Sequence, residues 1–278
     1  MPELPEVQAH AERLTGEFGG AVLARFEPLS FTVLRTYAPD PASATGDALV
    51  EVGRRGKLLL LRFGALTFVV HPMQGGRLRP DAKQSAKPRN GLARWRFDDG
   101  RALLLTEPGT ERKAGVWLID GDPLDQPPLD DLGPEIDTLD RDRLASLLAS
   151  TSMRIHGFLR DQHLVAGVGR RLANEICHRA RLSPFATTGS LDADAIDRLH
   201  AGISEVIDES LTFERDQDEM VSAADRPGAV HNRVGDPCPV CGDEVRSVEY
   251  RAYTVAYCPT CQTGGKVLAD NTTSKFLK

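Results

Sequence analysis

The sequence predicts an α+β protein: an N-terminal helix with a β-sandwich, then a helical domain, then a C-terminal β-hairpin carrying four cysteines. Three observations lead to this prediction. Apolar residues recur at helical spacing over residues 4–18, short apolar runs without intervening helices fill residues 21–120, and two Cys-x-x-Cys pairs lie near the C-terminus. A chain of 278 residues is long enough for one or two domains with sizeable cores.

The first predicted helix has an apolar stripe with alternating spacings of three and four residues. The stripe consists of Leu4, Val7, Ala11, Leu14 and Phe18, and Gly19-Gly20 ends it. Pro2 and Glu3 stand at its start, where proline and an acidic side chain are both favoured. Whatever chemistry these two residues carry would therefore be fixed on a helix that packs onto a core.

The β-rich region is marked by paired apolar runs. Residues 58–63 and 66–70 flank a glycine-containing turn, and residues 95–97 and 102–105 flank Asp98-Asp99-Gly100, which is typical of a hairpin. Many short strands without helices between them favour a sandwich or a small barrel.

The pattern becomes helical after two proline-containing stretches, Pro127-Pro128 and Gly133-Pro134. Three helices are expected, marked by Leu144, Leu147 and Leu148, by Leu172, Ile176 and Ala180, and by Ile196, Leu199, Ile203, Val206 and Ile207 behind a predicted Ser190 N-cap. Polar residues 213–230 are expected to form a mobile loop. We therefore predict a β-sandwich domain at 1–120, a linker at 121–138, a helical domain at 139–228 and a metal-binding hairpin at 229–278.

Charge is unevenly distributed along the chain. The net charge of −6 and the isoelectric point of about 5.7 argue mildly against a nucleic-acid partner. Residues 151–190, however, contain six arginines, which favours a surface that meets an anion, whereas acid-rich residues 120–143 are typical of a solvated linker.

The cysteine spacing predicts one structural zinc ion. Four thiolates, those of Cys238, Cys241, Cys258 and Cys261, can close a tetrahedron around Zn²⁺ and leave no open position for catalysis. Two disulfides would need an oxidising compartment, and residues 1–20 do not resemble a signal peptide. We expect a cytoplasmic protein without a membrane partner, in which Cys177 is a small buried apolar residue.

The first residues of the chain also suggest chemistry. Removal of Met1 would leave Pro2 as a secondary amine beside the Glu3 carboxylate. Such an amine can attack a sugar C1′ to form an iminium, and a carboxylate can move the protons that this step needs. The alternative interpretation of Pro2-Glu3 is a simple helix start.

Four motifs, in this order, resemble those of the formamidopyrimidine/endonuclease VIII family of DNA glycosylases. They are Pro2–Val7, Gly53–Lys57, Asp161-Gln162 with Ala166–Gly169, and Cys238 to Cys261-Gln262. The resemblance implies a helix–two-turn–helix module and a zinc finger. It also implies a monomeric base-excision-repair enzyme at the nucleoid, with glycosylase and β,δ-elimination AP-lyase activities. Its partner would be double-stranded DNA with a damaged base or abasic site, bound between the domains with the base flipped out.

The resemblance also assigns roles to single residues. Pro2 matches the family's nucleophile, which forms a Schiff base with C1′, and Glu3 matches its proton shuttle. Lys57 matches a lysine that meets DNA phosphate, although alone it would be read as a solvated turn lysine. Arg170 stands where the family usually has a phosphate-binding asparagine, behind the Gly167–Gly169 turn. Glu6 belongs to the same motif as Pro2, or is an exposed helix carboxylate.

The zinc hairpin departs from the family pattern. The family usually has an arginine five residues before the third cysteine, and here that position is Tyr253. The sequence leaves open whether Tyr253 or Arg251 takes the arginine's place, since two residues along a strand span roughly 6–7 Å. Phosphate binding at the lesion is therefore expected to be weaker or rearranged.

The side chains that fill the gap left by a flipped base also differ. Gln74 takes the position of the family's methionine, and Met73 could serve in its place after a shift. Arg112 is retained, so it can intercalate or pair with the orphaned base, whereas Ala114 replaces the family's phenylalanine. These gap-filling side chains form a wedge between the bases. A smaller wedge makes base flipping from an intact duplex harder and suits lesions that are already unpaired or bulky.

Two alternatives compete with the enzyme. One is a protein of the same fold that binds damaged or abasic DNA without turning it over, and the other is an unrelated zinc-ribbon protein with an accidental Pro-Glu start. The retained Pro2-Glu3 pair favours the enzyme, because binding alone needs no free amine. The excised base is left open among oxidised purines, oxidised pyrimidines and bulky alkyl adducts.

Overall fold

The computed structural model describes residues 1–220, 225–250 and 253–268, and the side chains of Tyr250 and Tyr253 are outside this description. The chain divides into two compact units. Unit 1 comprises the described residues of 1–132 and 214–221, and unit 2 comprises those of 133–213 and 222–278. The mixture of a helix-covered β-sandwich, a helical region and a cysteine-bearing hairpin confirms the predicted fold class.

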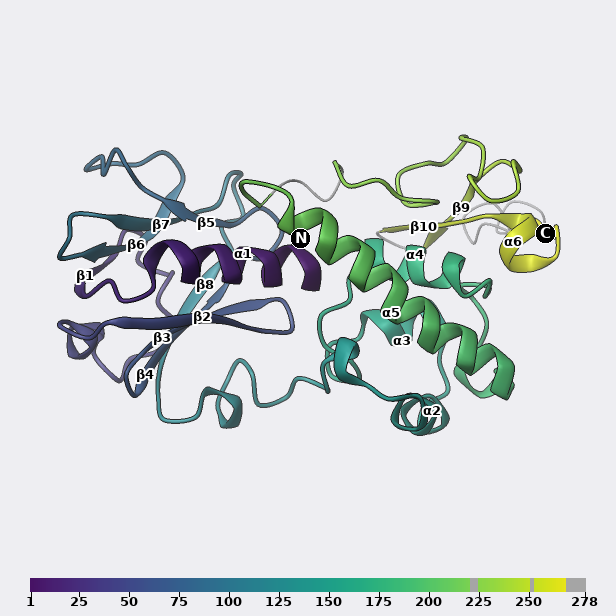
Figure 1. Cartoon of the computed structure of the whole chain (residues 1–278), viewed down its shortest axis with the longest axis horizontal. Coiled ribbons are helices and arrows are strands. Elements are labelled where there is room, and N and C mark those ends of the chain that lie inside the picture. Colours follow the sequence, from purple (N-terminus) through teal and green to yellow (C-terminus); the bar gives the residue numbers. More distant parts are fainter. Residues whose placement is uncertain (221–224, 251–252, 269–278) are drawn as a thin grey trace. The chain divides into compact units, whose positions relative to one another are not determined.

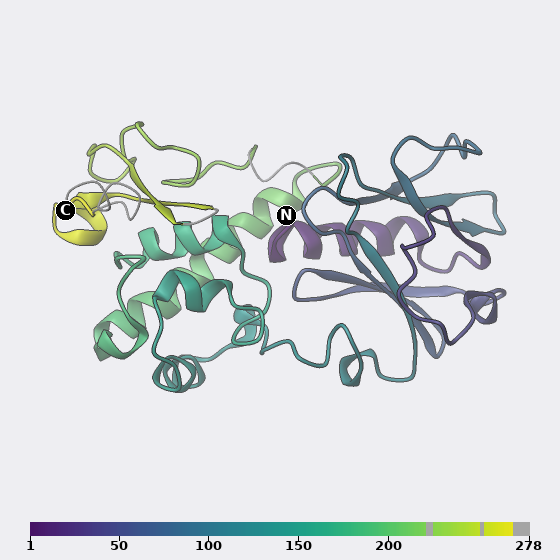
Figure 2. The same cartoon turned by 180° about the vertical axis from the view of Figure 1, so that it is seen from behind.

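Unit 1 begins with α1 (Leu4–Phe18), which the apolar spacing predicts correctly. All five residues of the predicted stripe are at most 1% exposed. The helix ends at Gly19, and Gly20 follows with a φ of 82°, a conformation that glycine adopts without strain. Figures 1 and 2 show α1 lying lengthwise between the two sheets, with its closest packing against β2 (Leu49–Arg55).

The two four-stranded antiparallel sheets form the sandwich. The first has the order β1 (Leu23–Pro28), β6 (Gly91–Phe97), β7 (Ala102–Thr106), β5 (Arg77–Pro80), and the second has the order β2, β3 (Leu58–Phe63), β4 (Leu66–His71), β8 (Gly115–Asp120). Both predicted strand pairs are confirmed as β3–β4 and β6–β7. Aromatic rings from both sheets, including Phe26, Phe68 and Trp95, meet with centroids 5.0–5.7 Å apart and close the core.

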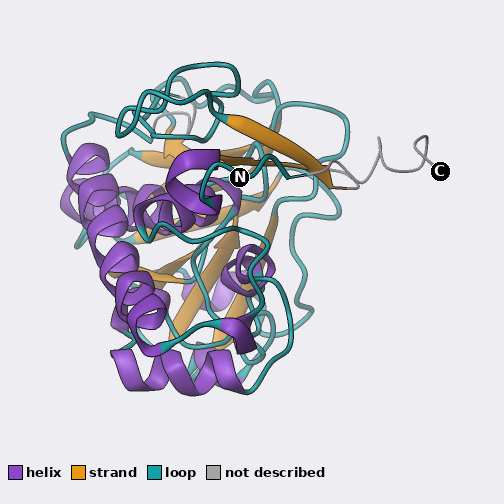
Figure 3. Cartoon of the chain, turned by 90° about the vertical axis from the view of Figure 1, so that its right-hand side faces the viewer, coloured by secondary structure: helices purple, strands orange, loops and turns teal. Residues whose placement is uncertain are grey.

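Unit 2 contains helices and the hairpin, coloured by class in Figure 3. Its elements are α2 (Arg141–Ala149), α3 (Ile155–Arg160), α4 (Arg170–Arg179), α5 (Ala193–Arg215), β9 (Arg246–Tyr250), β10 (Tyr253–Tyr257) and α6 (Pro259–Thr263). Short 3₁₀ turns at Pro41–Ala44, Pro123–Asp125, Ile136–Thr138 and Thr188–Ser190 complete the described elements of the chain.

The predicted N-cap of α5 is wrong. Ser190 ends a 3₁₀ turn, and Asp192 caps the helix because its carboxylate accepts the Ala195 N–H at 2.8 Å. Both residues are good N-caps, and the sequence offers no signal that separates them.

The expectation of a mobile loop at 213–230 is wrong at its start. Phe213–Arg215 belong to α5, and the Glu214 and Met220 side chains are buried. Arg13 of α1 donates hydrogen bonds to the carbonyls of Glu214 (2.8 Å) and Gln217 (3.2 Å), which fixes this segment on unit 1. Residues 221–224 of the predicted loop lie outside the described residues.

Among the described residues, no helix combines the length and apolar character that a membrane span requires.

Candidate active site and metal centre

The N-terminal residues form a compact, buried group. Pro2, Glu3 and Glu6 are all buried, and the Glu3 backbone N–H donates to Glu6 Oε2 at 3.0 Å. In return the Glu3 carboxylate accepts the N–H of Glu6, which makes a capping box. Glu6 is 1% exposed, so its interpretation as an exposed helix carboxylate is wrong. The group places a carboxylate directly beside Pro2 on a rigid helix.

A second group forms around the β2–β3 turn and the residues after β4. Lys57 is buried, contrary to its alternative interpretation as a solvated turn lysine. Burial and the positive charge of Lys57 lower the pKa of His71 to about 4. The ring is therefore neutral at pH 7, which allows His71 Nδ1 to accept the Met73 backbone N–H at 2.9 Å.

Two of the residues considered for the gap left by a flipped base, Met73 and Arg112, have strained backbones. Met73 and Arg112 have φ values of 53° and 41°, which non-glycine residues rarely adopt and which concentrate at functional sites. Arg112 and Gln74 are exposed, whereas Met73 is half-buried. Ala114 is 2% exposed and its N–H donates to the buried Glu107 carboxylate at 2.7 Å. Position 114 therefore faces the core rather than a ligand.

The glycine turn leads into α4 as predicted. Gln162 shapes it by accepting the Gly167 N–H (3.1 Å) and donating to the Val168 carbonyl (2.9 Å). Arg170, the first residue of α4, is exposed. Within unit 2 it lines a cavity of about 530 Å³ together with Asn174, His231, Asn232, Val234, Thr254 and Ala256. A helix N-terminus that carries an exposed guanidinium is a favourable place for an anion.

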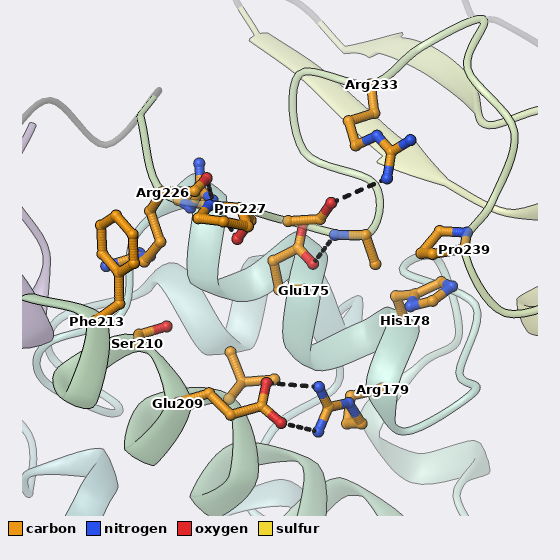
Figure 4. A pocket seen from close by; sticks show the side chains of 14 residues that line it. Glu175, His178, Arg179, Glu209, Ser210, Phe213, Arg226, Pro227, Arg233 and Pro239 are labelled. Carbon is orange, nitrogen blue, oxygen red and sulfur yellow. Dashed lines mark hydrogen bonds and ion pairs between the residues drawn. The ribbon is translucent and has the colours of Figure 1, made fainter.

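Two of the six arginines in residues 151–190 are bonded within the protein and do not form a surface for an external anion. Arg171 is buried and donates to the carbonyls of Pro227 (2.9 Å) and Arg226. Arg179 makes a bidentate ion pair with Glu209 (2.7 and 2.9 Å), which Figure 4 shows in the floor of a second cavity. The prediction of one anion-binding surface across residues 151–190 is therefore too broad.

The second cavity, about 480 Å³ in volume, lies between α4, α5 and residues 226–239. Its central feature is the Glu175 carboxylate, which accepts the backbone N–H groups of Ala229 (2.7 Å), Val230 (3.1 Å) and His231 (2.7 Å). These bonds fix the start of the C-terminal segment on α4.

The four predicted zinc ligands come together. Their sulfur atoms all lie within 4.8 Å of one another, with Cys238–Cys261 at 3.9 Å and Cys241–Cys258 at 3.4 Å. A tetrahedral Zn²⁺ with bonds near 2.3 Å separates its sulfurs by about 3.8 Å, so the cluster fits this ion. Bound there, the ion would supply rigidity and no open coordination position.

Two side chains of the unit connect this cluster to the helices, and the sequence reasoning missed both. His178 Nε2 of α4 lies 3.3 Å from Cys238 Sγ, and Gln262 bridges the Cys258 N–H (2.8 Å) and the Leu182 carbonyl (2.9 Å). A signal for His178 exists in the spacing of Arg171, Asn174, Glu175 and His178, which places four polar residues on one face of α4.

Arg251 lies outside the described residues, as does the side chain of Tyr253. Their predicted roles at the zinc hairpin therefore stay predictions.

Comparison with known proteins gives consistent results. Residues 1–117 match the formamidopyrimidine-DNA glycosylase N-terminal domain, and residues 132–221 match the H2TH domain of the same family. A formamidopyrimidine-DNA glycosylase of Chloroflexus aurantiacus is 31% identical over 276 residues, covering 94% of this chain and 98% of that protein.

Solved structures show the same fold. The MutM (Fpg) protein of Thermus thermophilus has a TM-score of 0.81 at 29% identity, covering 96% of this chain and all of that one. Lactococcus lactis Fpg, in a complex with abasic-site DNA, has a TM-score of 0.82 at 22% identity, covering 94% of this chain and 99% of that one.

Proposed function

This chain belongs to the formamidopyrimidine-DNA glycosylase family, and from that premise we propose that it is a base-excision-repair DNA glycosylase that also has AP-lyase activity. The proposal extends to its substrate, double-stranded DNA that contains a damaged base or an abasic site. We further propose that it acts as a monomer at the nucleoid.

In the proposed reaction, the Pro2 nitrogen attacks C1′ of the damaged nucleotide and the C1′–base bond breaks. The base leaves with a proton. The C1′–O4′ bond then breaks and O4′ takes up the proton that the Pro2 nitrogen loses, so that the sugar ring opens and an iminium joins Pro2 to C1′. Loss of a proton from C2′ then expels the 3′ phosphate, and a second elimination expels the 5′ phosphate. Glu3 moves these protons, because it is the carboxylate next to the nitrogen.

One observation carries this proposal: Pro2 and Glu3 are held together at the start of a helix whose apolar face is anchored in the core of unit 1. A nucleophile that is fixed in position avoids the entropy cost of being ordered in the transition state.

DNA binding is proposed to involve Lys57, Met73, Arg112 and Arg170, with Arg251 as the candidate from the zinc hairpin. Exposure of Arg112 and Arg170 supports direct contacts. Lys57 is buried in the free protein, so we assign it a phosphate that approaches closely beside His71. Cys238, Cys241, Cys258 and Cys261 hold the structural zinc.

Borohydride trapping on a duplex with one abasic site tests the proposal. We expect a covalent adduct with the native N-terminus and none with an N-terminally extended form, whose Pro2 nitrogen is an amide. Glu3→Gln should still form the adduct but cleave the strand more slowly, because only the proton shuttle is changed. Tight binding by the native form without an adduct would instead indicate a damage-binding protein that lacks the chemistry.

A further inference from the structure

The exposed phenylalanine at position 31 is the least expected surface residue of unit 1. Its exposed fraction is 103%, and it lies in a turn in which the Val33 N–H donates to the Ser30 carbonyl at 3.3 Å. Turn positions favour glycine, proline, asparagine, aspartate and serine, so a large apolar ring there gains nothing from the fold. The ring face is therefore available to a ligand.

The turn is fixed next to the loop that carries Arg112. Leu34 forms a parallel bridge with Val116, in which Val33 accepts the Val116 N–H and Arg35 donates to the Val116 carbonyl, both at 2.8 Å. In a parallel arrangement, residues before Leu34 lie toward the residues before Val116. Val33, the last residue of the turn, therefore lies toward the residues that precede Val116, and Phe31 stands two residues before Val33.

Positive charge surrounds the same place. Arg35 is exposed, and its Nη2 donates to the Lys113 carbonyl at 3.3 Å. Its Nε lies close to Gly115, because a Cβ atom added at position 115 would come within 3.1 Å of it. Lys113 Nζ makes an exposed ion pair with Glu111 (2.8 Å), a type of contact that stabilises little.

An exposed ring among cationic side chains is the combination that binds nucleic-acid bases, through stacking on the ring and contacts of the cations with phosphate. The loop itself cannot supply this ring, because Ala114 is small and faces the core. Resting on the proposed glycosylase function, we propose that Phe31 stacks on the DNA bases beside the gap left by the flipped nucleotide, with Arg35 and Lys113 on the adjoining phosphates.

The test measures binding to a duplex with one tetrahydrofuran abasic-site analogue, which neither activity cleaves. We expect Phe31→Ala to weaken binding about 5- to 100-fold, the range for loss of one aromatic stacking contact. Phe31→Trp should bind like the wild type. Phe31→Leu should bind like Phe31→Ala, because it keeps apolar contact and loses the ring face.

Tyr37 provides a matched control. It is equally exposed, at 105%, on the same segment, but it follows the bridge and therefore lies toward the opposite end of β8, where Thr36 accepts the Leu118 N–H at 2.9 Å. Tyr37→Ala should leave binding unchanged. Equal loss in both variants, or no loss in Phe31→Ala, would overturn the proposal.

Two further readouts separate stacking from charge and from chemistry. Phe31→Ala should keep the salt dependence of binding, whereas Arg35→Ala should lower its slope by about one unit, as expected for one phosphate contact. At saturating protein, Phe31→Ala should still form the borohydride adduct on a true abasic site. Absence of the adduct in the wild type would contradict the proposed function. The comparison of DNA affinities between Phe31→Ala and Tyr37→Ala would still test the stacking proposal.

Discussion

At the scale of single residues, His178 shows how unit 2 could support the proposed zinc ion in its cysteine cluster. A zinc-bound Cys238 is a thiolate with lone pairs only, so the contact at 3.3 Å requires His178 Nε2 to carry the proton and donate it. Donors of this kind hold a metal ligand in position and tune its charge. His178 is thus expected to be a positioning residue for the metal site.

The corresponding prediction is that His178→Phe, which keeps a ring and removes the donor, lowers zinc affinity about 10- to 100-fold. Zinc release to a chromophoric chelator measures this without any activity assay. His200→Phe is the control, because His200 bonds the Leu139 carbonyl at 3.0 Å instead of a cysteine. Equal release rates from both variants would show that the 3.3 Å contact has no influence on the metal.

Sequence reasoning located residues whose role depends on residues close by in the chain. It missed residues whose role depends on contacts with residues far away in the chain. The four cysteines come together as their spacing predicts. The burial of Ala114 against Glu107, and the bridge between Leu34 and Val116, depend on how distant segments pair. No local pattern in one sequence encodes these contacts. The sequence therefore indicated which residues could fill the gap left by a flipped base, but not which of them are buried and which are exposed.

At the scale of elements, α4 has a polar face that is not solvated. A face with Arg171, Asn174, Glu175 and His178 would be read from sequence as exposed, yet Arg171, Asn174 and His178 are at most 5% exposed. All four bond residues of the segment 226–238, and Asn174 and Glu175 both contact His231. The helix that presents Arg170 is therefore tied along its length to the segment that leads into the cysteine cluster.

Glu175→Gln tests this connection. The glutamine loses the charge and places an NH₂ group where backbone N–H groups converge, so we expect unit 2 to lose about 2–3 kcal/mol of stability. Hydrogen exchange in residues 226–238 should become faster and the melting temperature lower. Glu205→Gln is the matched control, since its exposed pair with Arg179 (2.8 Å) is worth at most about 1 kcal/mol. Similar effects of both substitutions would contradict a special role for Glu175.

At the scale of the whole molecule, buried histidines link stability to pH. Burial is the main cause that lowers the pKa values of His10 and His71 to about 4 in unit 1, and those of His156 and His231 to about 3 and 4 in unit 2. Their folded pKa values lie below the unfolded value of about 6.5, so the unfolded state binds more protons below that pH.

Stability should therefore be complete above about pH 6.5 and fall as the pH decreases toward 4, by up to about 1.4 kcal/mol per pH unit for each histidine. Because each unit contains two of these histidines, both units should melt at lower temperature at pH 5 than at pH 7.5. A melting temperature that stays constant between these pH values would show that the histidines are protonated in the folded protein.

Zinc removal should unfold the cysteine hairpin of unit 2 and leave the fold of unit 1 intact. Each unit has its own core, and the core around the cysteines is small, with Val230, Val245 and Ala256 as its apolar members beside Cys238 and Cys258. Such a small core needs its metal, whereas the sandwich core does not. Both tryptophans, Trp95 and Trp117, belong to unit 1, so their fluorescence reports that unit alone.

We therefore expect chelation to weaken DNA binding strongly while the tryptophan emission and its thermal transition stay unchanged. Borohydride trapping at high protein concentration should survive in part, because Pro2 and Glu3 lie in the unit that keeps its fold. A red shift of the emission on chelation would mean that the sandwich depends on the metal. The cysteine cluster would then stabilise the unit that contains Pro2 as well as the hairpin of unit 2.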